Sequence, residues 1–142
     1  MIIKEKRIDI SIDQPKKIAD IFQDIFKTYD EIEIEKERVY TIGLDNQNHI
    51  MFIDLTHIGM INQSVVDRRV ILRMLLLKGC TGVILVHNHP AEYNTPMPSA
   101  EDINVTKSIK EACKLMDIEL LDHIILNRDA TNFYSFKADN LI

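Results

Sequence analysis

The sequence has few of the residues from which several common kinds of site are built. It contains two cysteines, Cys80 and Cys113, and they do not form the Cys-x-x-Cys pair typical of structural zinc sites and thiol redox sites. Both lie in or beside apolar segments, so we expect them to be buried free thiols. Redox chemistry and cysteine-ligated metal sites are therefore not indicated.

Long apolar runs and an excess of positive charge are also missing. No apolar run approaches the ~20 residues of a membrane-spanning helix, and the first residues do not resemble a signal peptide. We therefore expect a cytoplasmic protein that does not insert into a membrane. The formal net charge is −5, so no overall basic field attracts nucleic-acid phosphates. Nucleic-acid binding would need a local basic patch. The residues that could form such a patch are interpreted first as the solvated face of a helix: Arg68, Arg69, Arg73 and Lys78.

Several catalytic signatures are absent as well. The sequence has no His-Glu-x-x-His motif of zincin proteases, no Gly-x-Ser-x-Gly elbow and no phosphate-binding glycine loop. It also lacks the His-x-Glu and Pro-Cys-x-x-Cys motifs of nucleobase deaminases. These classes of enzyme are excluded on their motifs.

The pattern of apolar residues predicts one α/β domain with a mixed sheet. The length of 142 residues suffices for one domain with a real core and not for two. Strands are expected within residues 2–12 and at 39–44, 49–55, 82–86, 118–126 and 133–136. Helices are expected from Pro15, after Asp67 and from Ser99 to about residue 116.

Two histidines stand at the exit of the predicted buried strand 82–86. Because side chains alternate along a strand, His87 and His89 point to the same side. Neutral imidazole suits zinc and similar divalent ions, and ligands collect at the carboxyl ends of strands in such sheets. The spacing alone leaves a metal site and an ordinary packing role as open alternatives.

A carboxylate on the following helix can complete this set of ligands. Ser99 and Asp102 fit the Ser-x-x-Asp/Glu capping box, which requires no chemistry and which the spacing favours. The two roles are compatible, because a metal needs only one carboxylate oxygen and the helix dipole favours the ionised form. Two nitrogens, one oxygen and an open position are typical of a catalytic zinc site.

A metal hydrolase also needs a base. Residues 30–37 contain several acids, which by default form a solvated edge. Glu37 is best placed because it closely precedes the strand 39–44, but its role does not follow from spacing. The other histidines lack paired spacing and are interpreted as strand-end, surface or structural residues: His49, His57 and His123.

These motifs, in this order, resemble the JAMM (JAB/MPN) metalloprotease signature in its RadC-like form. The resemblance rests on His-Asn-His-Pro (87–90), Pro-Ser-Ala-Glu-Asp-Ile (98–103), Leu-Leu-Asp-His-Ile-Ile (120–125) and Tyr-Ser-Phe (134–136). It implies a three-layer α/β sandwich with a mixed central sheet, like that of cytidine deaminases. It also implies a division into an N-terminal strand and helix extension, 1–36, and a RadC-like JAB/JAMM domain, 37–142.

The resemblance further implies the roles of individual residues. Zn²⁺ would be bound by His87, His89 and Asp102, with a water as the fourth ligand. Ser99 would help to stabilise the tetrahedral intermediate. The run Glu-Arg-Val-Tyr-Thr-Ile-Gly-Leu-Asp (37–45) makes Glu37 the candidate general base, with Glu35 as the fallback.

Three functions are compatible with these residues. The first is a zinc-dependent metallohydrolase, a peptidase or isopeptidase acting on a peptide or protein. The second is a binding module in DNA repair or mobile-element biology with a vestigial or structural metal site. The acidic balance weighs against direct DNA binding, and residues 1–36 have no room for the helix-hairpin-helix domain that often precedes this module. The third is a metal-free scaffold, which would not need the complete His/His/Ser/Asp set.

Overall fold

The computed structural model describes residues 2–4, 8–11, 14–62 and 64–142. Its strands are β1 (Ile2–Lys4), β2 (Ile8–Ser11), β3 (Arg38–Leu44), β4 (His49–Ile58), β5 (Gly82–Asn88), β6 (Glu119–Leu126) and β7 (Phe133–Ser135). Its helices are α1 (Pro15–Phe26), α2 (Arg68–Leu77), α3 (Ala100–Leu115) and the 3₁₀ turn η1 (Glu33–Glu35). The N-terminal alternation thus forms two short strands rather than one, and its last residue, Ile12, lies outside the described residues.

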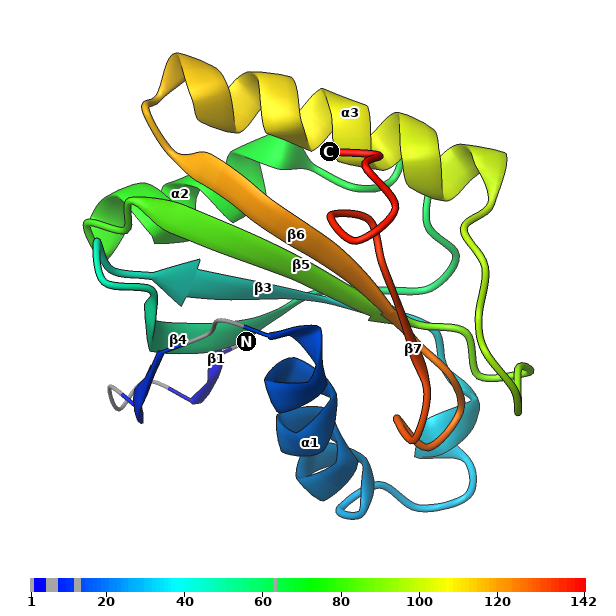
Figure 1. Cartoon of the computed structure of the whole chain (residues 1–142). Coiled ribbons are helices and arrows are strands. Elements are labelled where there is room, and N and C mark those ends of the chain that lie inside the picture. Colours follow the sequence, from blue (N-terminus) through cyan, green and yellow to red (C-terminus); the bar gives the residue numbers. More distant parts are fainter. Residues whose placement is uncertain (1, 5–7, 12–13, 63) are drawn as a thin grey trace.

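The described strands form one seven-stranded mixed sheet. Its order is β1-β4-β3-β5-β6-β7, and β2 also pairs with β4. β3 is antiparallel to both β4 and β5, whereas β5 and β6 are parallel and are connected through α3. Helix α1 covers one face of the sheet, and α2 and α3 cover the other (Figure 1). The predicted three-layer α/β sandwich with a mixed central sheet is confirmed.

Alternation along β5 separates two apolar cores. Ile84 and Val86 belong to the core under α1, while Val83 and Leu85 belong to the core under α2 and α3. The whole strand is buried, as its apolar run predicts. Because side chains alternate, His87 continues the row of Val83 and Leu85 and places its ring beneath α3. The fold thereby directs a polar ring into the layer between the sheet and a helix.

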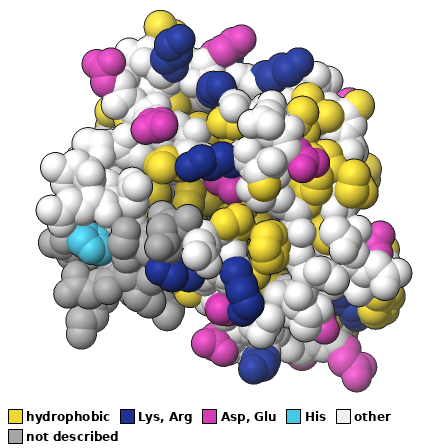
Figure 2. Space-filling view, viewed as in Figure 1, with side chains coloured by type: hydrophobic (Ala, Val, Ile, Leu, Met, Phe, Trp, Pro, Cys, Tyr) yellow, Lys and Arg dark blue, Asp and Glu magenta, His cyan; other side chains and the backbone are white. Residues whose placement is uncertain are grey.

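The structure bears on three expectations from composition: the state of the cysteines, the surface charge and membrane-spanning helices. Cys80 and Cys113 are free and buried. Acidic and basic side chains are interspersed over the face seen in Figure 2, so this face has mixed charge. Among the described residues, no helix combines the length and the apolar character needed to cross a bilayer.

Candidate metal centre

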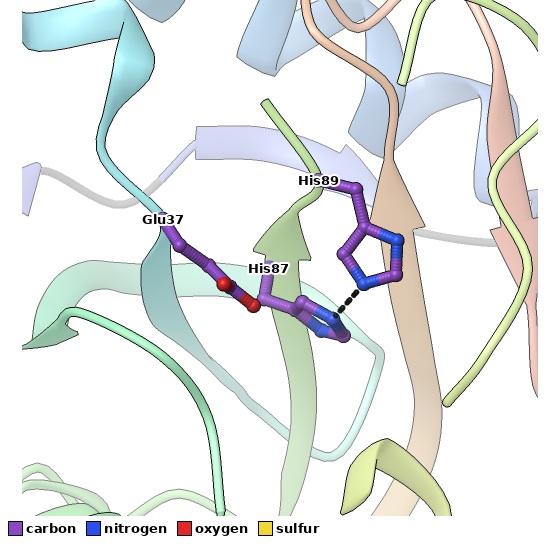
Figure 3. Close-up of side chains that lie close together, drawn as sticks. All are labelled: Glu37, His87 and His89. Carbon is purple, nitrogen blue, oxygen red and sulfur yellow. Dashed lines mark hydrogen bonds between the residues drawn. The ribbon is translucent and has the colours of Figure 1, made fainter. Parts of the chain in front are cut away.

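Two histidines and a glutamate meet at the carboxyl end of β5. His87 is the penultimate residue of the strand, His89 follows it, and their Nε2 atoms lie 3.0 Å apart. Glu37 immediately precedes β3 and turns its carboxylate toward the His87 ring (Figure 3). One ligand atom from each of these three side chains lies within 4.8 Å of the others. The two imidazoles therefore converge on one space, as period-two alternation predicts.

Asp102 reaches the same space from the first turn of α3. Its Oδ1 atom lies 3.2 Å from His87 Nε2, and its Oδ2 atom lies 3.2 Å from His89 Nε2. The predicted capping box is present, because the Ser99 N–H donates to Asp102 Oδ2 (2.9 Å) and the Asp102 N–H donates to Ser99 Oγ (3.0 Å). One carboxylate thus caps the helix and faces both imidazoles.

The side chains of His87, His89 and Asp102 are spaced so that a divalent cation would fit between them. Asp102 Oδ1 is buried and, within the described residues, accepts no hydrogen bond, although His87 Nε2 is 3.2 Å away. Two Nε2 atoms 3.0 Å apart cannot both carry a proton in the space between them. Ligand atoms around a tetrahedral zinc ion with Zn–N of about 2.0–2.1 Å lie roughly 3.3–3.4 Å apart. The observed distances are close to this value, and the donor set suits zinc.

Burial and neighbouring groups set the charges in this cluster. Burial lowers the pKa of the fully buried His87 ring, so the ring is neutral and can offer a lone pair. Burial alone would raise the pKa of Asp102, but its contacts with His87 and His89 outweigh burial and hold that pKa well below its usual value. Asp102 is therefore an ionised carboxylate at neutral pH, which is the form that binds metal ions.

Glu37 is fixed through its main chain by the residue between the two histidines. Asn88 Oδ1 accepts the Arg38 N–H (2.7 Å), and Asn88 Nδ2 donates to the Lys36 carbonyl (3.0 Å). Both neighbours of Glu37 are thus bound to one buried side chain at the end of β5. Burial raises the pKa of Glu37. The sequence pattern gave no role for Asn88, although a polar residue at a buried strand end must find hydrogen-bond partners.

The other predicted site residues have different surroundings. Ser99 is exposed, and because the cap uses a lone pair of its Oγ atom, its hydroxyl proton is available to another acceptor. Glu35 forms an exposed ion pair with Arg128 (2.6 Å), and the hydrogen bond from Arg128 lowers the Glu35 pKa. The structure therefore groups Glu37, and not Glu35, with the two histidines.

The cluster borders a pocket of about 570 Å³. The His89 side chain is 24% exposed, whereas that of His87 is fully buried behind it. The lining combines acidic, apolar and polar residues: Glu37, Met60, Ile61, His89, Pro90, Ala91, Glu92, Ser99, Glu101 and Asp102. The cluster is therefore open to the pocket on one side, at His89, as a catalytic site requires and a closed structural site does not.

Two buried residues behind His87 were not assigned to the site from sequence. His87 Nδ1 lies 2.7 Å from His123 Nε2, and His123 Nδ1 lies 2.5 Å from Thr106 Oγ1. His123, which we interpreted as structural, stands opposite Leu85 in the parallel pairing of β5 with β6. The contact depends on this pairing of segments distant in sequence, so spacing along the chain gave no signal for it.

Comparisons with known proteins agree with this architecture. The family model for the RadC-like JAB domain matches residues 12–141. A UPF0758 protein of Methanosarcina mazei is 36% identical over 123 residues, covering 85% of this chain and 53% of the relative. A UPF0758 protein of Clostridium acetobutylicum is 34% identical over 133 residues, covering 94% of this chain and 54% of the relative. The chain thus spans about half the length of the curated relatives it matches.

Proposed function

Because the chain belongs to the RadC-like JAB domain family, we propose that it is a zinc-dependent hydrolase that cleaves amide or isopeptide bonds in a peptide or protein. The observation that carries this proposal is the convergence of His87, His89 and Asp102 beside an open pocket. A carboxylate with a raised pKa, that of Glu37, stands next to them. A metal-binding set and an adjacent base are the parts that metal-assisted hydrolysis needs.

The ion would be held by His87 Nε2, His89 Nε2 and the Asp102 carboxylate. A bound Zn²⁺ ion supplies Lewis acidity, lowering the pKa of water to about 7 and polarising a carbonyl group. The protein orients the ligands in advance: the capping box fixes Asp102, and burial fixes the ring of His87. Little reorganisation is then needed when the ion binds.

Two further side chains would act on the substrate and the attacking water. Glu37 accepts a proton from the water and delivers it to the leaving nitrogen as the C–N bond breaks. Burial moves the pKa of Glu37 upward, toward neutral pH, which suits a group that first takes and then gives a proton. The Ser99 hydroxyl donates to the carbonyl oxygen as negative charge develops there. Such a donor contributes on the order of 3 kcal/mol in other acyl-transfer sites.

Metal removal tests this function directly. We expect the zinc-loaded protein to cleave members of a mixed peptide and isopeptide library, detected by mass spectrometry. Treatment with 1,10-phenanthroline abolishes cleavage, and added Zn²⁺ restores it. If zinc binds stoichiometrically but no amide is cleaved, the hydrolase proposal is wrong. If no zinc binds at all, the binding-module alternative takes its place.

Replacing Asn88 by alanine should slow catalysis without removing the metal. The change removes the Asn88 hydrogen bonds to both neighbours of Glu37, and a displacement of about 1 Å in a catalytic group can cost ~100-fold in rate. It also removes the acceptor of the buried Arg38 N–H, so melting must be measured alongside turnover. We expect a lower kcat with zinc content unchanged. An unchanged kcat would mean that Asn88 does not position Glu37.

A further inference from the structure

A chain of three hydrogen bonds runs behind the candidate metal centre. The Thr106 hydroxyl lies 2.6 Å from the Asp102 carbonyl oxygen and 2.5 Å from His123 Nδ1. His123 Nε2 lies 2.7 Å from His87 Nδ1. The chain thus starts at the main chain of one candidate ligand and ends at the ring of another.

The position of each proton in this chain follows from its first acceptor. A carbonyl oxygen can only accept, so Thr106 must donate its single hydroxyl proton to Asp102. The Thr106 oxygen can then only accept, and the proton of that hydrogen bond must sit on His123 Nδ1. A neutral His123 therefore has a bare Nε2 atom, which accepts the proton carried by His87 Nδ1.

The surroundings of His123 favour this neutral form. The residue is 0% exposed, and its ring stacks on Phe136 with centroids 4.7 Å apart and planes 16° apart. Phe136 is itself fully buried. A second proton on His123 would place an N–H against His87 Nδ1 and oppose the tautomer described above.

We propose that Thr106 and His123 are positioning residues that hold His87 as its Nδ1–H tautomer and so present the Nε2 lone pair to a divalent metal ion. The inference rests on the proposed metal site. It adds that the tautomer of His87 is set by the polypeptide before metal arrives. A metal-binding histidine usually donates its one ring N–H to a hydrogen-bond acceptor, which raises ligand basicity and fixes the ring.

The arrangement also couples the two ligands to each other. Asp102 Oδ1 faces His87 Nε2 at 3.2 Å, and the Asp102 carbonyl begins the chain that ends at His87 Nδ1. A shift of α3 relative to β6 would therefore disturb the carboxylate and the imidazole together.

The test compares Thr106→Val, which keeps the shape of the side chain but removes its hydroxyl, with Thr106→Ser, which keeps the hydroxyl. Long-range ¹⁵N–¹H NMR of the metal-free protein reports the tautomer of each histidine. Competition with a chromophoric chelator gives the affinity for Zn²⁺ alone. We expect His87 as the Nδ1–H tautomer in the wild type and in Thr106→Ser. In Thr106→Val we expect mixed tautomers and a loss of about 10–100-fold in zinc affinity.

Two results would overturn the proposal. One is a wild-type protein whose His87 carries its proton on Nε2, and the other is a Thr106→Val protein with unchanged tautomer and zinc affinity. Neither readout uses hydrolysis, so a protein that binds zinc but cleaves nothing refutes the hydrolase proposal alone. The wild-type NMR measurement also remains decisive if a variant fails to fold.

Discussion

Glu37→Gln leaves the metal bound and reduces hydrolysis by about 10²–10⁴-fold, the usual contribution of a general acid–base group. Glutamine keeps the size and polarity of the side chain but cannot take a proton from water. The loss should therefore appear in kcat, while zinc content measured by plasma mass spectrometry stays near one ion per chain. This separation of chemistry from metal binding identifies Glu37 as the base.

Glu35→Gln is the matched control for this experiment. It makes the same change two residues away, where the carboxylate pairs with Arg128 on the surface and does not face the histidines. We expect it to keep both zinc and activity. Full activity in Glu37→Gln would remove Glu37 from the mechanism. A loss of activity in Glu35→Gln alone would transfer the role to Glu35.

The central part of the site could be predicted because it depends on local geometry. The alternation of a strand brings His87 and His89 to one side, and the capping pattern places Asp102 at a helix start. Both relations join residues close in sequence, so they do not depend on how distant segments pack. The helices and strands of the α/β domain were predictable for the same reason, since each segment shows its own apolar period, whereas the three-layer arrangement was implied by the family resemblance.

The supporting residues depend on contacts between distant segments, so spacing could not reveal them. Asn88 binds main-chain groups about 50 residues earlier, because β3 and β5 are neighbours in the sheet. His123 meets His87 only through the parallel pairing of β5 and β6, and Thr106 meets His123 only because α3 lies over that pair. A sequence shows that such residues are polar in apolar surroundings but not which partner they find.

Asp102→Asn should abolish zinc binding while the helix cap survives. The amide oxygen can still accept the Ser99 N–H, but the side chain no longer offers an anionic ligand to the ion. We expect zinc affinity to fall by more than about 100-fold, beyond the loss caused by an outer-shell partner. Zinc should raise the melting temperature of the wild type and leave that of the variant unchanged, because only a bound ion stabilises the folded state.

Glu101→Gln supplies the control, since it removes the same charge from the same helix turn at an exposed position. We expect this variant to keep zinc. That result would assign the loss of zinc in Asp102→Asn to lost coordination and not to a weaker interaction with the helix dipole. If Asp102→Asn binds zinc as tightly as the wild type, Asp102 is a cap only. Glu37 would then be the third ligand beside His87 and His89, an alternative that the 4.8 Å grouping of these three side chains allows. In that case Glu37→Gln would lose zinc, so the two variants together decide which carboxylate binds the ion and which moves the proton.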